Sequence, residues 1–206
     1  MIFKKNKINV LIGFGGHSKV VLEVLNIHNI NITHVLTKET ISSSNKFNFI
    51  NSLEEFRDVT DPISFYFGIG DLSLRKRIFQ NIISQINHPE FPSFIHPSAT
   101  VYSTARIGSG TQVMAHAIIG PNSIIKDYSI INHGSIVDHD TNIGNFVNIC
   151  PNVTIGGNAY VGNEVFIGMG ASISNNVRIC DYSTIGAQTF LNKDILEPQK
   201  FLGNNI

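Results

Sequence analysis

Residues 131–161 read INHGSI VDHDTN IGNFVN ICPNVT IGGNAY V when they are divided into blocks of six, and every block opens with Ile or Val. The same step of six continues in both directions without an insertion. Its sixteen members are Ile95, Val101, Ile107, Val113, Ile119, Ile125, Ile131, Val137, Ile143, Ile149, Ile155, Val161, Ile167, Ile173, Ile179 and Ile185. The fourth residue after each member is small or β-branched, as at Ser135, Thr141 and Val147. A period of six excludes an amphipathic helix, in which apolar residues recur about every 3.6 residues.

This hexapeptide repeat predicts a left-handed parallel β-helix. Each hexapeptide can form a short strand and a corner, with the β-branched aliphatic side chain pointing inward and the small side chain at the bend. Three such sides close one coil, so the series would form about five coils stacked at the strand spacing of roughly 4.8 Å. A coil of this kind can serve as an enzyme or only as a scaffold, and the repeat alone does not separate the two.

The residues before the repeat show a mixed α/β pattern. Residues 8–12 are apolar and β-prone, residues 13–18 read GFGGHS, and apolar residues then follow at helical spacing. Further strands are expected at 33–36 and 63–67, and the latter leads into GIGD at 68–71 and a helix over 74–86. We therefore predict a small Rossmann-like βαβαβα domain over residues 1–92 and a β-helix domain with a C-terminal tail over residues 93–206.

The two glycine turns, GFGGHS and GIGD, indicate a ligand site in the first domain. A glycine turn before a helix directs backbone N–H groups to a place where a phosphate can bind. It is not an ordinary dinucleotide fingerprint, because Ser18 replaces the third glycine and Thr37 and Lys38 stand where an acidic residue would follow the second strand. The domain could also be a mere cap on the β-helix, but two glycine-bearing strand ends at one sheet edge favour binding.

The hexapeptide VDHDTN at 137–142 carries the strongest catalytic pattern. With Val137 inward, Asp138, His139 and Asp140 fall on the outward-facing turn. A carboxylate beside an imidazole fixes its tautomer, which suits His139 to take a proton from an attacking amine or hydroxyl, although a solvated turn histidine is the plainer interpretation. Because three hexapeptides make one coil of about 18 residues, His139 should lie beside Gly157, whose N–H could donate to a thioester oxygen.

Composition narrows the possible partners. Lys and Arg number 15 and Asp and Glu number 15, so the formal net charge is zero and no basic run could follow a nucleic acid backbone. The first apolar stretch is short and runs into glycines, unlike a signal peptide or a membrane span. We expect a cytoplasmic protein with no nucleic acid partner and no membrane partner.

The whole chain resembles the PglD-type, NeuD-like nucleotide-amino-sugar N-acetyltransferases of the hexapeptide acyltransferase superfamily. The matching segments are GFGGHS at 13–18, GIGD at 68–71 with Arg75 downstream, FIHPSA at 94–99, IINHGSIVDHD at 130–140 and IGAQT at 185–189. The combination covers almost the entire chain. It is specific for the family and much less so for the substrate.

The resemblance implies a homotrimer with active sites between subunits, acetyl-CoA as the donor, no metal, and direct attack of the amine on the thioester. It implies His139 as the general base and Asp140 as its orienting partner. The nucleotide sugar would be bound through Gly15, Gly16, His17, Gly68, Ile69 and Asn132. Acetyl-CoA would be bound through Asn148, Gly157, Gly168 and Ala187.

Three departures from the family pattern bear on the substrates. Asn148 stands where the pattern has a second histidine, and the C-terminal FLGNNI at 201–206 lacks the proline of the usual GVPA. Thr37 and Lys38 replace acids that can bind ribose hydroxyls in UDP-binding relatives, which favours a deoxyribose. The expected substrate is dTDP-4-amino-4,6-dideoxyglucose, for surface polysaccharide such as O-antigen.

Four alternatives stay open at this point. Two are transferases: acetylation of a UDP-4-amino-sugar and O-acetylation of a sialic-acid-type sugar. A third is a metal-dependent, carbonic-anhydrase-like hydro-lyase with His116, His133 and His139 as candidate ligands. The fourth is a sugar-binding scaffold without catalysis.

Overall fold

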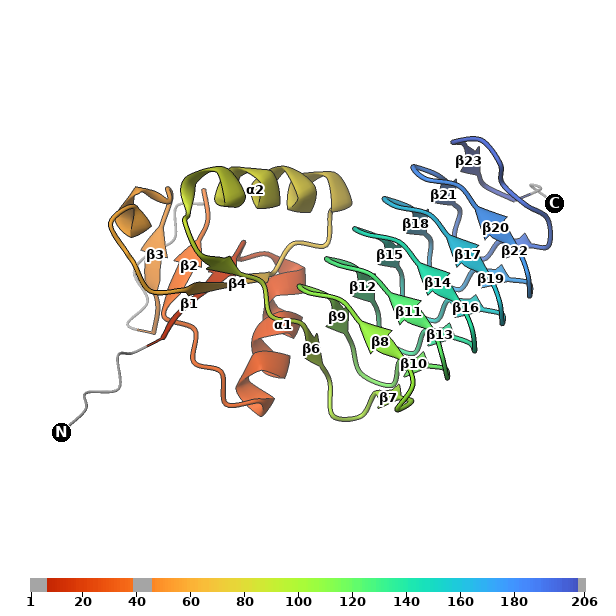
Figure 1. Ribbon diagram of the computed structural model, residues 1–206, viewed down its shortest axis with the longest axis horizontal. Helices are drawn as coiled ribbons and strands as arrows, with labels where there is room; N and C mark the ends of the chain where they lie inside the picture. Colours follow the sequence, from red (N-terminus) through yellow and green to blue (C-terminus); the bar gives the residue numbers. More distant parts are fainter. Residues whose placement is uncertain (1–6, 39–45, 204–206) are drawn as a thin grey trace. The chain divides into compact units, whose positions relative to one another are not determined.

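The computed structural model describes residues 7–38 and 46–203. The chain divides into two compact units, Met1–Pro92 and Ser93–Ile206 (Figure 1). The last three residues of the FLGNNI tail lie outside the described residues, as do the first six residues of the chain. No helix in the described ranges is long and apolar enough to cross a membrane.

The first unit is built on a five-stranded sheet in the order β3-β2-β1-β4-β5, and every pairing is parallel. The strands are β1 (Ile8–Ile12), β2 (His34–Leu36), β3 (Asn48–Ile50), β4 (Ile63–Phe67) and β5 (Pro89–Glu90). The apolar runs of β1 and β4 lie in the middle of the sheet, where almost all their side chains are buried. Because strand order reverses between β1 and β4, the glycine turns that follow them lie together at a topological switch point.

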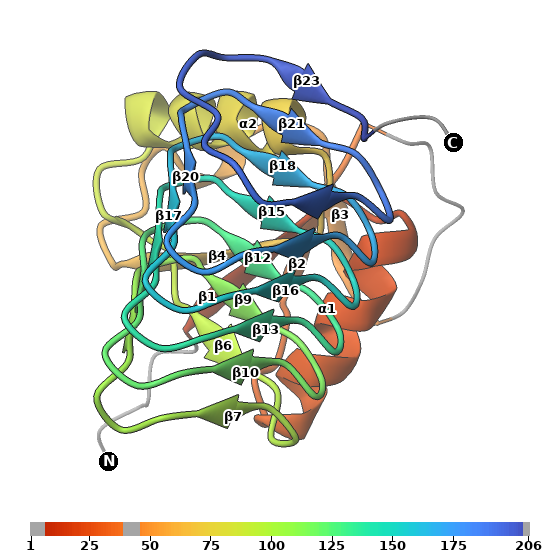
Figure 2. The same cartoon turned by 90° about the vertical axis from the view of Figure 1, so that its right-hand side faces the viewer.

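Two α-helices accompany this sheet, α1 (Gly16–Ile27) after β1 and α2 (Leu72–Gln85) after β4. They lie on opposite faces of the sheet (Figures 1 and 2), as right-handed crossovers in opposite directions require. Between β2 and β4 the described residues form β3 and the short 3-10 helix η1 (Glu54–Phe56). The predicted Rossmann-like parallel sheet is confirmed, although its middle connection departs from strict βαβαβα alternation.

The second unit is the predicted left-handed parallel β-helix, whose two-residue strands stack into three flat faces (Figure 2). Face 1 contains β6 (Phe94–Ile95), β9 (Gln112–Val113), β12 (Ile130–Ile131), β15 (Asn148–Ile149), β18 (Phe166–Ile167), β21 (Thr184–Ile185) and β23 (Lys200–Phe201). Face 2 contains β7 (Thr100–Val101), β10 (Ile118–Ile119), β13 (Ile136–Val137), β16 (Thr154–Ile155), β19 (Ser172–Ile173) and β22 (Phe190–Leu191). Face 3 contains β8 (Arg106–Ile107), β11 (Ile124–Ile125), β14 (Asn142–Ile143), β17 (Tyr160–Val161) and β20 (Arg178–Ile179).

The repeated aliphatic residues form the core of this unit, as the period of six predicts. From Val113 to Ile185 each member of the series is at most 3% exposed, and all of them belong to one apolar cluster. From β6 to β19 each strand pairs with the strand 18 residues further along, for example Val137 with Ile155, while β21 pairs with β23 after 16 residues. One coil is therefore three hexapeptides, and residues 18 apart occupy equivalent places in neighbouring coils.

Two features make the corners of the coils. One residue in most hexapeptides has a positive φ, either a glycine or a residue such as Asn122 or Asp140. The small residue that follows is buried, and where it carries a hydroxyl it often donates to a carbonyl oxygen of the next coil, as Ser129 does to Gly144 at 2.9 Å. Large side chains are excluded there because the position is buried inside the bend, and a hydroxyl at this position also satisfies a buried carbonyl.

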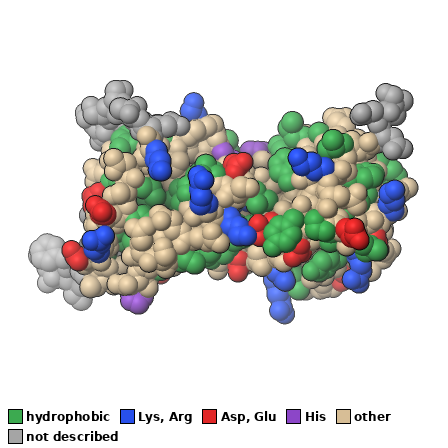
Figure 3. Space-filling model, turned by 90° about the horizontal axis from the view of Figure 1, so that it is seen from above, with side chains coloured by type: hydrophobic (Ala, Val, Ile, Leu, Met, Phe, Trp, Pro, Cys, Tyr) green, Lys and Arg blue, Asp and Glu red, His purple; other side chains and the backbone are tan. Residues whose placement is uncertain are grey.

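The surface carries charges of both signs. On the face seen in Figure 3, Lys and Arg side chains are interspersed with Asp and Glu, and hydrophobic side chains reach the surface between them. Exposed apolar residues on the β-helix include Tyr160, Phe166, Met169 and Phe190.

Candidate active site

The candidate catalytic turn is residues 138–141, which join β13 on face 2 to β14 on face 3. Val137 and Thr141, at its two ends, are fully buried. Asp140 has φ 57, a left-handed conformation that Asp tolerates better than most residues. This local geometry turns the chain sharply between two anchored ends and leaves Asp138, His139 and Asp140 on the outside.

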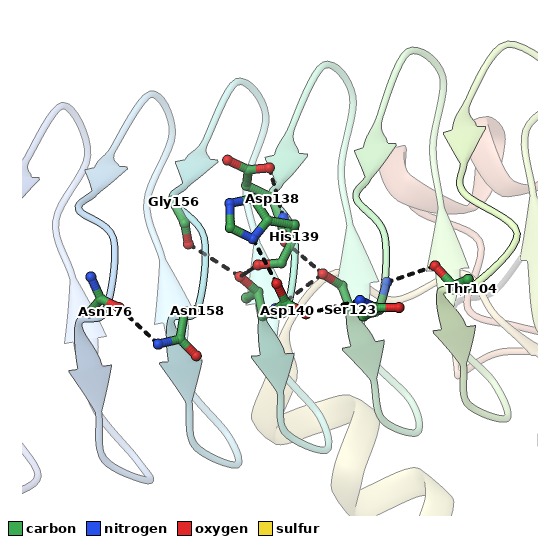
Figure 4. Close-up of polar contacts among 10 residues, drawn as sticks. Thr104, Ser123, Asp138, His139, Asp140, Gly156, Asn158 and Asn176 are labelled. Carbon is green, nitrogen blue, oxygen red and sulfur yellow. Dashed lines mark hydrogen bonds and ion pairs between the residues drawn. The ribbon is translucent and has the colours of Figure 1, made fainter.

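Two buried hydroxyl groups, those of Ser123 and Thr141, hold the turn through hydrogen bonds to backbone atoms. Ser123, one coil earlier, donates from Oγ to the carbonyl oxygen of Asp138 at 2.6 Å and accepts from the backbone N–H of Thr141 at 3.2 Å. Thr141 donates from Oγ1 to the carbonyl oxygen of Gly156 at 3.2 Å (Figure 4). The position of the turn is therefore set by its neighbours in the coils before and after it.

His139 and Asp140 form a hydrogen-bonded pair on this turn. Nδ1 of His139 lies 2.8 Å from Oδ2 of Asp140, and both side chains are about half exposed at 51% (Figure 4). Asp138 accepts from the backbone N–H of His139 through Oδ1 at 2.7 Å. With Nδ1 directed at a carboxylate, Nε2 is the ring nitrogen that can accept a proton from a bound nucleophile.

The surrounding carboxylates change how the pair titrates. The hydrogen bond to Asp140 and the negative charge of Asp138 raise the pKa of His139 above its ordinary value. Hydrogen bonds from His139 and Asn122 lower the pKa of Asp140. The geometry therefore favours a proton on the imidazole once it is acquired, as a general base requires.

Gly157 lies against the imidazole, one coil further on. A Cβ placed on Gly157 would lie 2.5 Å from Nε2 and 2.6 Å from Cε1 of His139. The ring thus covers the bare Cα of this glycine, while the carbonyl oxygen of His139 accepts from the backbone N–H of Asn158 at 2.9 Å. Within the described ranges the N–H of Gly157 has no hydrogen-bond partner, and the residue itself is buried beneath the imidazole.

The other β-helix residues singled out in the sequence lie away from this turn. Asn132, Gly168 and Ala187 occupy corners between faces 1 and 2, where a Cβ on Gly168 would lie 2.5 Å from the backbone nitrogen of Ala187. Asn148 lies on β15 of face 1 and is 8% exposed. A single subunit therefore brings together His139, Asp140 and Gly157, but leaves these four residues on another edge or face of the prism.

Apart from Asn132, the residues predicted to bind the nucleotide sugar lie in the glycine turns of the first unit. Gly15 and Gly16 are open, because nothing lies within 4 Å of a Cβ placed on either. Gly68 packs against the start of α1, where its Cβ would meet Cβ of Ser18 at 2.6 Å, and a Cβ on Gly70 would lie 3.9 Å from His17. These contacts bring the turns after β1 and β4 into a single glycine-rich edge.

Arg75 supports this edge from within by binding the backbone of Ile69 and Gly70. Arg75 is fully buried and donates through Nη1 to the carbonyl oxygens of Ile69 at 3.3 Å and Gly70 at 3.2 Å. Burial lowers the pKa of Arg75 to about 10. Its side chain is therefore a brace that fixes the backbone of the second glycine turn.

His116 and His133, the other candidate metal ligands, form no metal-binding group with His139 among the described residues. Among the described residues no group of three or more His, Cys, Asp or Glu side chains could hold a metal ion. His133 contacts Oδ1 of Asn132 through Nδ1 at 2.7 Å, and burial together with the charges of His96 and His116 lowers its pKa.

Asn122 is a residue of this site that the sequence reasoning missed. Its Nδ2 donates to Oδ1 of Asp140 at 3.1 Å. The available signal was the spacing of 18 residues between the two positions, the same rule that places Gly157 beside His139.

Comparison with known proteins identifies the family. The family described as PglD N-terminal domain matches residues 9–82, and the bacterial transferase hexapeptide family, described as six repeats, matches residues 158–193. The acetyltransferase domain of PglB from Neisseria gonorrhoeae FA1090 is 32% identical, with a TM-score of 0.85 over 95% of this chain and 96% of that domain. This chain belongs to the PglD-type sugar N-acetyltransferases. The family expected from the sequence motifs is thereby confirmed.

The descriptions of two further relatives of this PglD-type protein state a sugar nucleotide. PerB from Caulobacter crescentus, solved in complex with CoA and GDP-perosamine, is 29% identical with a TM-score of 0.82 over 93% of this chain and 91% of that one. UDP-N-acetylbacillosamine N-acetyltransferase of Bacillus subtilis (strain 168) is 30% identical over 115 residues, or 51% of this chain. The match spans only 50% of that curated relative's length.

Proposed function

We propose that this protein transfers an acetyl group from acetyl-CoA to the 4-amino group of a nucleotide-linked 4-amino-4,6-dideoxyhexose. The observation that carries the proposal is the His139–Asp140 pair, whose free Nε2 faces the bare backbone of Gly157. In the transfer the sugar nitrogen forms a bond to the acetyl carbon, the carbon–sulfur bond of the thioester breaks, and the amine proton passes to Nε2. The imidazolium can return that proton to the departing thiolate.

The neighbours of His139 supply the other requirements of this reaction. Asp140 holds Nδ1 and stabilises the imidazolium that forms when Nε2 takes the proton. The unpartnered N–H of Gly157 can donate to the acyl oxygen as negative charge develops on it. No nucleophilic side chain is needed, because the amine attacks the thioester directly.

Acetyl-CoA is the donor that the comparisons support. The acetyltransferase domain of N. gonorrhoeae PglB has been solved in complex with acetyl coenzyme A. We propose that Asn148, Gly157, Gly168 and Ala187 line the equivalent site here. The chain departs from the family pattern at Asn148, so its contact with the acyl group would be made by an amide in place of an imidazole.

The active site is proposed to form between subunits of a homotrimer. Asn132, Gly168 and Ala187 lie on a different edge of the prism from His139, so two edges must meet for all of them to act on one substrate. A neighbouring subunit provides the second edge in this proposal. Mixed trimers of His139→Ala and Ala187→Arg, a change at an exposed position, should regain activity if the site is shared and each variant is inactive alone, and should stay inactive if it is not.

We propose dTDP-4-amino-4,6-dideoxyglucose as the sugar, for surface polysaccharide made from cytoplasmic precursors. The nucleotide would lie on Gly15, Gly16, His17, Gly68 and Ile69. Its deoxyribose is favoured because Thr37 and Lys38, directly after β2, offer no carboxylate to a ribose 2′-hydroxyl. The relatives named above act on, or bind, UDP- and GDP-linked sugars.

The decisive experiment measures thiol release from acetyl-CoA with dTDP-, UDP- and GDP-linked 4-amino sugars and their C4 epimers. The expected result is the highest kcat/KM with the dTDP-linked substrate. A preference for UDP or GDP would overturn the nucleotide assignment and leave N-acetyl transfer standing. Failure to acetylate any amino sugar would overturn N-acetylation and would point to O-acetylation of a sialic-acid-type sugar.

A further inference from the structure

The carboxylate of Asp140 is held on both sides. Oδ2 faces Nδ1 of His139 at 2.8 Å, and Oδ1 accepts a hydrogen bond from Nδ2 of Asn122 at 3.1 Å. Asn122 lies in the turn between β10 and β11, one coil before the catalytic turn. A carboxylate with one oxygen occupied by an amide cannot rotate away from the imidazole without breaking that bond.

Asn122 is itself anchored. Its backbone N–H donates to Oγ1 of Thr104 at 2.9 Å, and its φ of 59 places it in the left-handed corner conformation. The backbone N–H of Asp140 donates to the carbonyl oxygen of Pro121 at 2.9 Å, so the two turns are also joined through their main chains. Thr104, Asn122, Asp140 and His139 thus form one continuous hydrogen-bonded series across three coils.

The same edge of the prism repeats this arrangement further on without a carboxylate. Asn158 donates through Nδ2 to Oδ1 of Asn176 at 2.8 Å, and these residues lie 18 and 36 positions after Asp140 (Figure 4). Asp140 therefore takes the place of an amide in a stacked series of corner side chains. The two polar atoms of an amide could not both accept hydrogen bonds, as Oδ1 and Oδ2 of Asp140 do, because one of them is a donor.

We propose that Asn122 is a positioning residue for acetyl transfer, which fixes the carboxylate of Asp140 so that Oδ2 holds Nδ1 of His139 and directs Nε2 at the substrate. The inference rests on the proposed function, which it deepens. Asn122 does not touch the reacting atoms. Its bond to Asp140 is also one of the interactions that lower the pKa of this carboxyl group, which keeps it ionised beside the imidazole.

The test compares Asn122→Gly with Asn158→Gly. Both positions have left-handed φ values, 59 and 56, which glycine accepts without strain, and both substitutions remove a side-chain bond to the next coil. We expect Asn122→Gly to lower kcat about three- to tenfold, since it loses a hydrogen bond to an exposed charged group. KM for both substrates should stay within about twofold, and Asn158→Gly should keep wild-type kcat.

A double-mutant cycle separates positioning from a general loss of structure. If Asn122 acts through Asp140, Asn122→Gly should have no further effect on kcat in an Asp140→Gly background. Wild-type kcat in Asn122→Gly, equal losses in the two glycine variants, or additive losses in the cycle would each overturn the positioning role while leaving acetyl transfer intact. Absence of acetyl transfer in the wild-type protein would overturn the proposed function and this role with it.

Discussion

The imidazole of His139 lies over the Cα of Gly157, so close that a Cβ placed on that glycine would be 2.5 Å from Nε2. No side chain other than hydrogen fits at 157 while His139 keeps this position. The glycine therefore does more than form a corner: it admits the ring of the proposed base and leaves a backbone N–H beside it.

Gly157→Ala is expected to reduce kcat at least tenfold while changing stability little. The added methyl group meets the end of a side chain that can rotate out of the way, so the imidazole moves and the fold remains. Each 1.4 kcal/mol of lost transition-state stabilisation lowers the rate about tenfold. Steady-state kinetics and thermal unfolding measure the two effects, and full activity in this variant would refute the close packing.

Gly144→Ala should give the opposite result. A Cβ at this position would lie 2.6 Å from the carbonyl carbon of Gly162, which is backbone and cannot rotate away. We expect a loss of about 1–3 kcal/mol in the free energy of unfolding, since the coils must shift to make room. Chemical denaturation measures it, and activity of the folded fraction should be retained.

His139→Ala is expected to lower kcat about 10²- to 10⁴-fold, the range for removal of a general base. The side chain is half exposed, so the free energy of unfolding should hardly change. The matched control is His88→Ala, an exposed histidine of the first unit, which should keep wild-type kinetics. Comparable turnover in the two variants would contradict the role of His139.

The acid side of the pH–rate profile should report the pKa of His139. The base must be neutral to act, so kcat/KM should rise with pH through a pKa that Asp140 and Asp138 raise above 6.5. Replacing Asp140 by Asn removes the larger cause, so the acid limb should move to lower pH while kcat falls. The pKa of the sugar amine is the same for both proteins, so an unmoved limb would show that His139 does not control it.

Ser123→Ala tests whether the hydroxyl that is hydrogen-bonded to the backbone of the catalytic turn matters for catalysis. The hydroxyl donates to the carbonyl oxygen of Asp138 at 2.6 Å, and Ser129 makes the same kind of bond to Gly144 at another corner. Both serines are fully buried. Either alanine variant should lose about 1–3 kcal/mol of stability, because a buried carbonyl loses its partner. Only Ser123→Ala should also lower kcat, and equal kinetics in the two variants would contradict this.

The repeat alone was enough to predict the β-helix and the pairing of His139 with Gly157. A strict period of six fixes which side chains point inward, and three hexapeptides a coil then fix which residues are neighbours. The short strands β3 and β5 of the first unit were not predicted, because their sequences, NFI and PE, form no apolar run that stands out from the residues around them. They pair because β2 and β4 present open edges to them, which is a property of the assembled sheet.

The sequence by itself determined the fold class, the family and the identity of the candidate base, since all three depend on residue types at fixed spacings. Only the tertiary structure decided that Asp140 is held from two sides by His139 and Asn122. Spacing gives the level of a residue in the stack, but the direction of its side chain depends on the hydrogen bonds and packing that neighbouring coils provide.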